Sequence, residues 1–477
     1  MHKKLLFSLL VLISSTSALL AQPYLVSATP LDTTSKIFIN FFANGRAQYD
    51  VANYKIIYNT VETDGITPTT ASGMLCVPLV ACDSFGLVSY DHGTVLMRDD
   101  VPSRNNFEST IGKVFASTGY IATMPDYLGL GDNPGIHPYL HAESQATATI
   151  DLIRAAREFL ASNMPNINLN DEVMLTGYSQ GGHAAMGTAK YIQDNNLLGE
   201  FNVIAAAPAS GPYNLAGSQA DVFIQDLPYS NPGYVVYLLF GMNRAYGNIF
   251  NVPADILKAP YDTLIPPFFN GMFEMDTVNN LLPANISGYL QDSVLQAFIA
   301  DTVNQQHPIW QALNNNNNYD WTPQMPLRMY YCTADEQVSY QNSLDAEAAM
   351  NSNGAPNVKA LFNGNLNHGG CVLPSIAGAG FFFDSLSTSC TSFVGLMENT
   401  LAEMSVYPNP TDGKLYFDFS GEIKELSIAI YNGSGQLVLS RAQSSQDALD
   451  ISNLPASLYF VEVRAAESVQ RLRILKR

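Results

Sequence analysis

The sequence predicts an α/β fold with a mostly parallel sheet between two layers of helices, followed by a small all-β domain. Apolar runs with strand character alternate with helical runs between residues 50 and 400, which is the pattern of βαβ units. After Met404 the pattern changes to short segments of alternating apolar and polar side chains, which is typical of a β-sandwich. A chain of 477 residues also exceeds the length at which one hydrophobic core usually stops growing.

Composition and charge support this division. The chain is 47% apolar and only 14% charged, which excludes a wholly disordered or fibrous protein. Its net charge of −19 argues against nucleic acid as a partner, because nucleic acids are bound by cationic patches. Residues 23–403 carry 13 Lys and Arg against 34 Asp and Glu, whereas residues 404–477 carry eight of each. The change in charge balance indicates a domain boundary near residue 404.

The first 21 residues predict a secretory signal peptide. Lys3 and Lys4 precede a nine-residue, largely apolar run, Leu5–Ile13, and small residues follow up to a cleavage point after Ala21. A nine-residue helix rises about 14 Å, too little to cross a bilayer core of about 30 Å. No later stretch approaches 18 uninterrupted apolar residues, so we expect no transmembrane segment in the mature chain.

The central block supplies the elements of the sheet in order. Strands are predicted at 54–58, 73–79, 86–90, 120–124, 172–176, 201–206, 327–331 and 358–362, and helices at 107–117, 143–162, 182–194 and 339–350. Ligands of such sheets bind beyond the carboxyl ends of the strands. The chemistry is therefore expected in the strand-to-helix loops.

The loop Gly177-Tyr178-Ser179-Gln180-Gly181 carries the strongest chemical signal. It follows an apolar strand and precedes a helical run, and G-x-S-x-G in this context is the nucleophile elbow. The two glycines leave room for strand and helix to approach closely. The Ser179 hydroxyl is then raised at the helix N-terminus, where the helix dipole favours developing negative charge. Ser179 is the predicted nucleophile.

A nucleophilic serine needs a base and an orienting acid. Asp335 follows the strand at 327–331 and is the predicted acid, with Glu336 as the fallback. His368, in the loop after the strand at 358–362, is the predicted base. The order serine, acid, histidine, each after a later strand, is that of an α/β-hydrolase fold.

The loop Asp91-His92-Gly93-Thr94 follows the strand at 86–90, where this fold places its oxyanion loop. The backbone amides of Gln180, Gly93 and Thr94 are the predicted donors of the oxyanion hole. The other histidines receive structural interpretations: His183 packs under the elbow, and His137 and His141 are more consistent with structural roles than with the pocket rim. His307 has no clear context.

Residues 207–324 form an insertion far longer than a simple crossover. It is rich in aromatic residues and proline and has helical pieces such as 290–299, while the polar run 314–318 is interpreted as a loop. A largely helical cap over the active site would suit an apolar acyl chain. The alternative is a structural insertion that fills its own small core, and the sequence leaves both open.

Five cysteines are compatible with disulfides in an oxidising compartment. Cys76–Cys82 and Cys371–Cys390 are candidate pairs because they are close in the sequence, and Cys332 is expected to be free. No cysteine has the spacing of a metal ligand, and no cofactor or metal is expected.

The tail resembles a known family. Strands are predicted at 415–419, 426–431, 437–439 and 458–463, with a hairpin turn at 432–435. Val406-Tyr407-Pro408-Asn409-Pro410, Leu454-Pro455-Ala456-Ser457-Leu458-Tyr459 and the basic end Lys476-Arg477 are similar to the C-terminal sorting domain of the type IX secretion system. The resemblance implies export through the periplasm of a Gram-negative cell, with the domain commonly removed on arrival. The alternative is a carbohydrate-binding or adhesive module.

The central block resembles the secretory lipases, an α/β-hydrolase family. The resemblance rests on the elbow, on Asp91-His92-Gly93-Thr94, on residues 124–131 and 137–140, and on the positions of Asp335 and His368. It implies hydrolysis of carboxylic esters through an acyl-serine intermediate without a cofactor. The substrate would be a small-molecule or lipid ester.

The expected organisation is a signal peptide at 1–21, a catalytic domain at 22–400 with its cap at about 207–324, and a sorting domain at 404–477. The expected product is a secreted or cell-surface esterase or lipase, with the type IX machinery as a partner through the tail. Two alternatives stay open: a serine peptidase of prolyl-oligopeptidase type and a catalytically silent surface binding protein.

Overall fold

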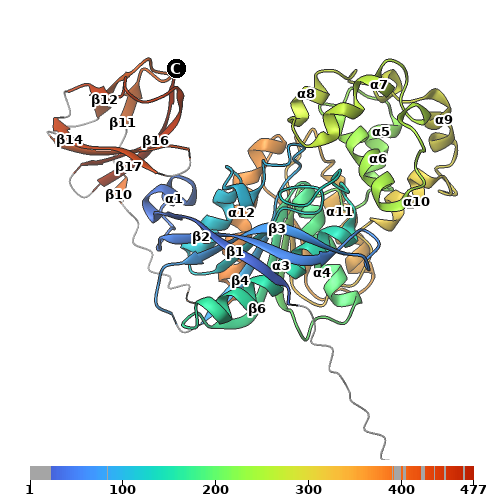
Figure 1. Cartoon of the computed structure of the whole chain (residues 1–477), viewed down its shortest axis with the longest axis horizontal. Coiled ribbons are helices and arrows are strands. Elements are labelled where there is room, and N and C mark those ends of the chain that lie inside the picture. Colours follow the sequence, from blue (N-terminus) through green and yellow to red (C-terminus); the bar gives the residue numbers. More distant parts are fainter. Residues whose placement is uncertain are drawn as a thin grey trace, which may run out of the picture.

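The computed structural model describes residues 23–82, 84–388, 390, 399–400, 404–419, 425–433, 436–444, 447–465 and 468–477. The predicted signal peptide lies outside these residues, as do Ser434 and Gly435 of the predicted hairpin turn. A large α/β unit bears a helical insertion on one side, and a small β unit lies on the side of helix α1 (Figure 1).

The large unit is built on a nine-stranded mixed sheet within the described residues, in the spatial order β1-β2-β3-β5-β4-β6-β7-β8-β9. Strands β5 to β9 run parallel, with β4 between β5 and β6, while β1, β2 and β3 pair antiparallel at the other end. The bounds are β1 Leu25–Thr34, β2 Val51–Val61, β3 Pro68–Pro78, β4 Phe85–Asp91, β5 Ile121–Pro125, β6 Leu169–Tyr178, β7 Asn202–Ala209, β8 Leu327–Tyr331 and β9 Val358–Phe362. All eight predicted strands are confirmed. Strand β1 was not predicted because it is a partly exposed edge strand without a continuous apolar run.

Two layers of helices cover the sheet. One face is covered by α3 (Ala142–Asn163), α4 (Gln180–Asp194) and α11 (Gln341–Ser352), whose apolar side chains join those of the strands in the larger core. The other face is covered by α1 (Lys36–Ala43), α2 (Ser109–Ser117) and α12 (His368–Asp384), which form a second core. The doubly covered, mostly parallel sheet confirms the predicted α/β class.

The insertion between β7 and β8 is largely helical, as predicted. Its helices are α5 (Ser218–Ile224), α6 (Gly233–Tyr246), α7 (Tyr261–Leu264), α8 (Met275–Asn279), α9 (Asp292–Ala300) and α10 (Pro308–Asn315), and they gather at one end of the α/β unit (Figure 1). They enclose a core of their own around Tyr237, Tyr289 and Trp310, to which Tyr139 and Leu140 of the α/β unit contribute. The insertion therefore has its own core and also packs on the loop that precedes α3.

The polar run 314–318 is a loop in part, as predicted, over residues 316–318. Asn314 and Asn315 end α10, and the side chains of Asn316 and Asn318 are buried. Asn316 Oδ1 accepts a 2.7 Å hydrogen bond from the amide of Ala142, at the start of α3. Asn316 and Asn318 thus satisfy buried backbone groups, whereas Asn314 and Asn315 are exposed to solvent.

The tail forms two small sheets within the described residues, in the orders β10-β17-β16-β13-β14 and β11-β12-β15. The bounds are β10 Asn399–Thr400, β11 Met404–Tyr407, β12 Lys414–Phe419, β13 Glu425–Tyr431, β14 Leu437–Ser444, β15 Leu449–Asp450, β16 Ser457–Ala465 and β17 Ser468–Lys476. Side chains from both sheets share one apolar core, as expected of a small sandwich. Tyr431 and Phe460 of this unit contact Phe38 of α1, with Phe38 and Phe460 rings 5.1 Å apart edge to face.

The disulfides correct the sequence-based pairing. Cys82 pairs with Cys390 and Cys332 pairs with Cys371, while Cys76 is a buried free thiol in β3. Proximity along the chain was a poor guide, because the parallel strands β8 and β9 bring the regions of Cys332 and Cys371 together although 39 residues separate them.

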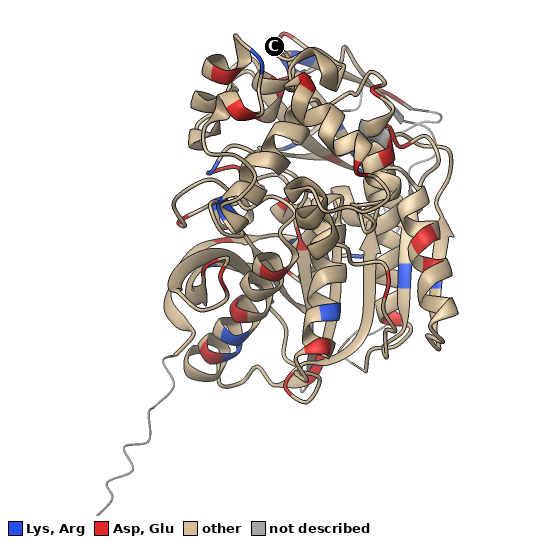
Figure 2. Ribbon diagram, turned by 90° about the vertical axis from the view of Figure 1, so that its right-hand side faces the viewer, with Lys and Arg blue, Asp and Glu red and all other residues tan. Residues whose placement is uncertain are grey.

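Acidic residues are distributed over the helices of the insertion and of the α/β unit, with fewer basic residues among them (Figure 2). Among the described residues, no helix combines the length and apolar character required to span a bilayer.

Candidate active site

Ser179 stands at a strained turn between β6 and α4. Its backbone has φ 59° and ψ −119°, a conformation that a non-glycine residue adopts only where its surroundings impose it. A Cβ on Gly177 would lie 2.2 Å from the carbonyl oxygen of Gly181, and one on Gly181 would lie 1.8 Å from that of Asp91. Only glycine fits at these two positions. The sequence thus forces the elbow geometry that presents the Ser179 side chain above the sheet.

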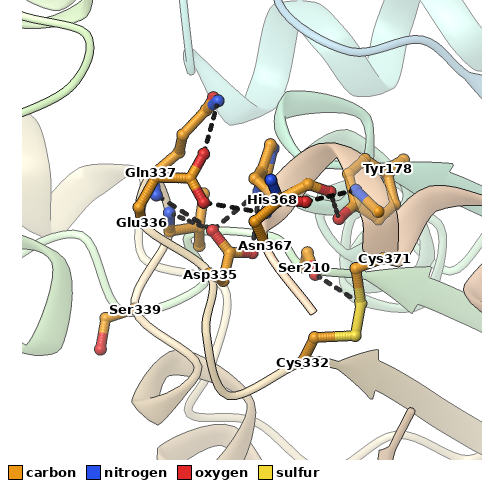
Figure 3. A network of polar contacts seen from close by, with 12 residues as sticks. Tyr178, Ser210, Cys332, Asp335, Glu336, Gln337, Ser339, Asn367, His368 and Cys371 are labelled. Atoms are coloured by element: carbon orange, nitrogen blue, oxygen red, sulfur yellow. Dashed lines mark hydrogen bonds and ion pairs between the residues drawn. A yellow bond between two sulfur atoms is a disulfide. The ribbon is translucent and has the colours of Figure 1, made fainter. Parts of the chain in front are cut away.

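Asp335 lies on the loop that follows β8, and His368 is the first residue of α12, which follows the neighbouring strand β9. Nδ1 of His368 lies 2.9 Å and 2.8 Å from the two carboxylate oxygens of Asp335 (Figure 3). The Asp335 side chain is almost wholly buried, and its Oδ1 also accepts hydrogen bonds from the amides of Gln337 and Val338 at 3.0 Å and 2.9 Å. A carboxylate fixed in this way holds a proton on Nδ1 and leaves Nε2 free to accept one.

Ser179 Oγ makes no hydrogen bond to His368 among the described contacts. Such bonds are often long or poorly aligned in free enzymes and form only when substrate binds. Ser179 is nearly buried, with 8% of its surface exposed, and it lines a pocket rather than facing bulk solvent.

Glu336, the alternative acid in the sequence, holds a different place. Its Oε2 accepts a 3.0 Å hydrogen bond from the backbone amide of His368, and no hydrogen bond joins its carboxylate to the imidazole. An acidic side chain at the first amide of a helix is favoured by the helix dipole. Asp335 is therefore the carboxylate that faces the base, and Glu336 helps to fix the start of α12.

The glycine-rich surroundings of His368 suggested a loop. The structure instead places His368 at the first residue of α12. Asn367 caps α12 by accepting a 2.8 Å hydrogen bond from the amide of Gly370. The carbonyl of His368 accepts a 2.6 Å hydrogen bond from the hydroxyl of Tyr178, the residue before Ser179. The base is thus tied directly to the elbow.

The predicted oxyanion donors separate into two groups. The amide of Gly93 already donates a 2.8 Å hydrogen bond to Glu108 Oε1, which also accepts from the hydroxyl of Tyr90 at 2.7 Å. Because one amide proton serves one strong acceptor, the Gly93 amide, already bonded to Glu108, is not a proposed donor to the oxyanion. The amides of Gln180, in the first turn of α4, and of Thr94 stay as candidates.

His137 lies beside the site, a position that the sequence did not predict. Nδ1 of His137 donates to the carbonyl of Leu128 at 2.7 Å, so its Nε2 accepts from the Gln180 side-chain amide at 2.6 Å. Burial lowers the pKa of His137 to about 3, so the ring is neutral near pH 7. His137 holds the side chain of the residue that follows the nucleophile. No signal in the sequence pairs these two positions, which are 43 residues apart.

The remaining histidines lie outside the chemistry. His183 is buried beneath the elbow between Gln145 and the carbonyl of Asn316, at 2.9 Å and 2.8 Å. His141 caps α3, and His307 caps α10. Burial lowers the pKa values of His183 and His141 to about 4.

The imidazole of His92 packs on Tyr127, with ring centres 4.4 Å apart, and its Nδ1 lies 2.7 Å from the carbonyl oxygen of Gly93.

A pocket opens at Ser179 beneath the insertion. Its other lining residues are mostly aromatic or aliphatic, with three glutamines: Tyr139, Leu140, Gln180, Pro212, Leu215, Gln219, Tyr229, Tyr234, Leu238, Gln337 and Val338. A second, wholly apolar cavity lies inside the insertion, and Leu238 lines both. In the part of the chain that the structure describes, no three His, Cys, Asp or Glu side chains are grouped as a metal site.

The comparison with protein families gives two matches. The sequence model of the secretory lipases matches residues 106–380, and that of the secretion system C-terminal sorting domain matches residues 405–477. No curated protein sequence matches. Both families are those that the sequence motifs indicated.

Solved structures extend the comparison. The ligand-bound form of the rice cell wall degrading esterase LipA from Xanthomonas oryzae is 29% identical with a TM-score of 0.67, and a putative hydrolase from Legionella pneumophila is 28% identical with a TM-score of 0.70. Each comparison covers 76% of this chain and 98% of the other. Lipase A from Candida antarctica, at 18% identity and a TM-score of 0.58 over 78% of this chain and 86% of that one, shares the fold. An α/β-hydrolase fold and a carboxylic ester hydrolase activity follow from the family and these structures together.

Proposed function

The chain belongs to the secretory lipase family, and from that premise we propose that it cleaves esters through an acyl-enzyme formed on Ser179, with His368 as base and Asp335 as acid. One observation carries the proposal: the imidazole of His368 turns Nδ1 to the buried Asp335 carboxylate, on a helix that Tyr178 ties to the elbow of Ser179. Membership of this family supports the general assignment of the chain as a secreted lipase or esterase. The serine mechanism and its residues are the proposal.

In the first half-reaction, Ser179 Oγ attacks the ester carbonyl carbon while its proton passes to Nε2 of His368. The carbonyl π electrons move to oxygen, and the resulting oxyanion accepts hydrogen bonds from the amides of Gln180 and Thr94. When the tetrahedral intermediate collapses, the C–O bond to the alcohol breaks and the imidazolium returns the proton to the departing oxygen. The acyl group is then an ester of Ser179.

In the second half-reaction, water takes the place of the alcohol. His368 Nε2 removes a proton from water as its oxygen attacks the acyl carbon, and collapse expels Ser179 Oγ, which takes the proton back. Asp335 stays ionised and stabilises the imidazolium in both halves. The net reaction consumes one ester and one water and yields one alcohol and one acid, so no cofactor takes part.

The pocket supports a neutral ester with an apolar acyl group as the substrate. Tyrosine, leucine, proline and valine side chains surround Ser179, and an apolar acyl chain would gain from burial among them. The net charge of −19 disfavours polyanionic substrates. A relative is described as a rice cell wall degrading esterase, so esters of plant wall polymers are a class to test beside lipid esters.

For the chain as a whole, we propose a signal peptide at 1–21, a catalytic domain at 22–400 with its cap at about 207–324, and the sorting domain at 404–477. The signal would direct the protein into the periplasm of a Gram-negative cell, and the tail would engage the type IX machinery for export to the surface or the medium. The match of residues 405–477 to a sorting domain supports this route.

Hydrolysis of p-nitrophenyl esters with acyl chains from C2 to C16 tests the function. We expect the purified protein to hydrolyse part of the series, and Ser179→Ala and His368→Ala to lose at least about a thousandfold in kcat. Two matched carboxyl-to-amide changes separate the acids: Asp335→Asn should lose far more activity than Glu336→Gln. Equal, slow hydrolysis by the parent and by Ser179→Ala would refute the mechanism. Cleavage of Xaa-Pro anilides in place of the esters would identify a peptidase.

A further inference from the structure

The disulfide Cys332–Cys371 joins the loop that carries the proposed acid to the start of helix α12, which carries the proposed base. Cys332 is three residues before Asp335, and Cys371 is three residues after His368, in the first turn of α12. Their Cα atoms are 6.0 Å apart, both residues are fully buried, and Figure 3 shows the sulfur bridge to the lower right of the Asp335–His368 contact.

Apart from the Asp335–His368 contact, the hydrogen bonds between the acid loop and the segment of the base each involve an exposed residue, and one of them joins the His368 amide to Glu336 Oε2 at 3.0 Å. The amide of Thr333 donates to the carbonyl of Gly364 at 3.2 Å, and its hydroxyl contacts Asn365 Oδ1 at 3.1 Å. Thr333, Glu336 and residues 365–367 are exposed to solvent. Hydrogen bonds at such positions exchange readily with water and define a geometry weakly. These hydrogen bonds by themselves define the 2.8 Å contact between Asp335 and His368 only weakly, and a covalent link at the same place adds to them.

The disulfide is anchored where it can fix both loops against the sheet. Cys371 Sγ accepts a contact from the hydroxyl of Ser210, at the end of β7, at 3.9 Å, and lies 3.6 Å from the hydroxyl of Ser375 in α12. Strand β7 neighbours the nucleophile strand β6 on one side and β8 on the other. The sulfur bridge thus connects β8 and α12 at the level of the elbow.

We infer that Cys332–Cys371 is a positioning cross-link for catalysis, which holds the carboxylate of Asp335 against the imidazole of His368. The inference rests on the proposed serine mechanism. The second disulfide, Cys82–Cys390, lies elsewhere: it joins the loop before β4 to the chain after α12, and within the described residues no hydrogen bond links it to the site. The two disulfides therefore offer a matched comparison within one chain.

The test compares Cys332→Ala/Cys371→Ala with Cys82→Ala/Cys390→Ala in the full chain, with p-nitrophenyl butyrate as substrate. A displacement of about 1 Å between catalytic groups can cost up to about a hundredfold in rate, so we expect kcat of the first variant to fall about tenfold or more. Its KM should stay within about twofold, because the acyl pocket is untouched. The second variant should keep both constants.

A double-mutant cycle with Asp335→Ala separates positioning from general support. If the disulfide acts through the acid–base pair, its removal should cost nothing further in kcat once Asp335 is absent. Equal, additive losses in both backgrounds would overturn the inference, as would a kcat of Cys332→Ala/Cys371→Ala that matches the control. If Asp335→Ala and Ser179→Ala themselves keep full activity, the proposed serine mechanism is wrong. These two variants therefore distinguish failure of the mechanism from failure of the positioning inference.

A second measurement covers the case in which Cys332→Ala/Cys371→Ala does not fold. The variant Cys82→Ala/Cys390→Ala keeps Cys332–Cys371 as its disulfide, so graded reduction followed by alkylation isolates that bond. We expect kcat to fall in proportion to the alkylated fraction of Cys332 and Cys371 while circular dichroism stays native. Full kcat in a fully reduced, folded sample would contradict the inference.

Discussion

The side chains of His137 and Gln180 meet through their Nε2 atoms at 2.6 Å, one residue beyond the nucleophile. Because Nδ1 of His137 donates to Leu128, the neutral ring can only accept from the glutamine amide. The contact restrains the residue whose backbone amide is a proposed oxyanion donor.

We expect His137→Phe to keep the ring packing with Tyr127 and Tyr237 but to leave two buried polar groups unpaired. Such groups cost about 1–3 kcal/mol each, so the free energy of unfolding should fall by about 2 kcal/mol or more. kcat/KM should fall several-fold as the restraint on Gln180 is lost. Urea unfolding and ester hydrolysis measure the two effects. Unchanged stability and activity would show that the contact is dispensable.

Glu108 is expected to set the shape of the oxyanion loop through its hydrogen bonds to Gly93 and Tyr90. Glu108→Ala should lower kcat about tenfold with little change in KM, because oxyanion contacts strengthen only in the transition state. The affinity for a trifluoromethyl ketone inhibitor should fall in parallel. Tyr90→Phe removes only the second hydrogen bond and should cost less. An increase in KM alone would contradict this role.

Leu238 lines both the pocket at Ser179 and the apolar cavity of the insertion. We expect Leu238→Trp to lower activity on C12–C16 esters relative to C2–C4 esters, since each buried methylene contributes about 0.8 kcal/mol. An exposed leucine of the same insertion, Leu281, provides the control Leu281→Trp. A chain-length profile that is identical in the two variants would remove the second cavity from substrate binding.

Asp91 is fully buried beneath the elbow, where burial raises its pKa to about 8. In the unfolded chain the carboxyl ionises near a pH of about 4, so between these values the folded state binds one more proton. Stability therefore falls as pH rises through this window, by about 1.4 kcal/mol per pH unit for this group. Asp91→Asn should remove that slope in urea unfolding between pH 5 and 8. An unchanged slope would mean that Asp91 is ionised in the fold.

The sequence predicted features whose causes are local. The elbow around Ser179 could be identified because its glycines, its strand and its helix are adjacent in the chain, and each is required sterically. The eight strands of the large sheet could be predicted from apolar runs. The strands of the tail could be predicted because apolar and polar side chains alternate along them. Asp335 and His368 were located by their order after strands, which the parallel sheet brings side by side.

Contacts between distant segments could not be predicted. The Gly93–Glu108 hydrogen bond, which engages the Gly93 amide, joins a loop to the start of α2, and the His137–Gln180 contact joins a loop to the first residue of α4. The disulfides were mispaired for the same reason, because distance along the chain says little about distance in space. Helix α12 was hidden by the two glycines after His368, which a cap from Asn367 makes tolerable.

In the proposed mechanism Ser179 carries the acyl group during turnover, and covalent labelling can locate that group. The purified protein is treated with a fluorophosphonate, or quenched in acid during turnover of p-nitrophenyl butyrate, and its peptides are mapped by mass spectrometry. We predict one modified site, Ser179, with loss of activity in proportion to phosphonate labelling, and no label in Ser179→Ala. Modification of another residue, or hydrolysis that continues with Ser179 fully labelled, would contradict the account.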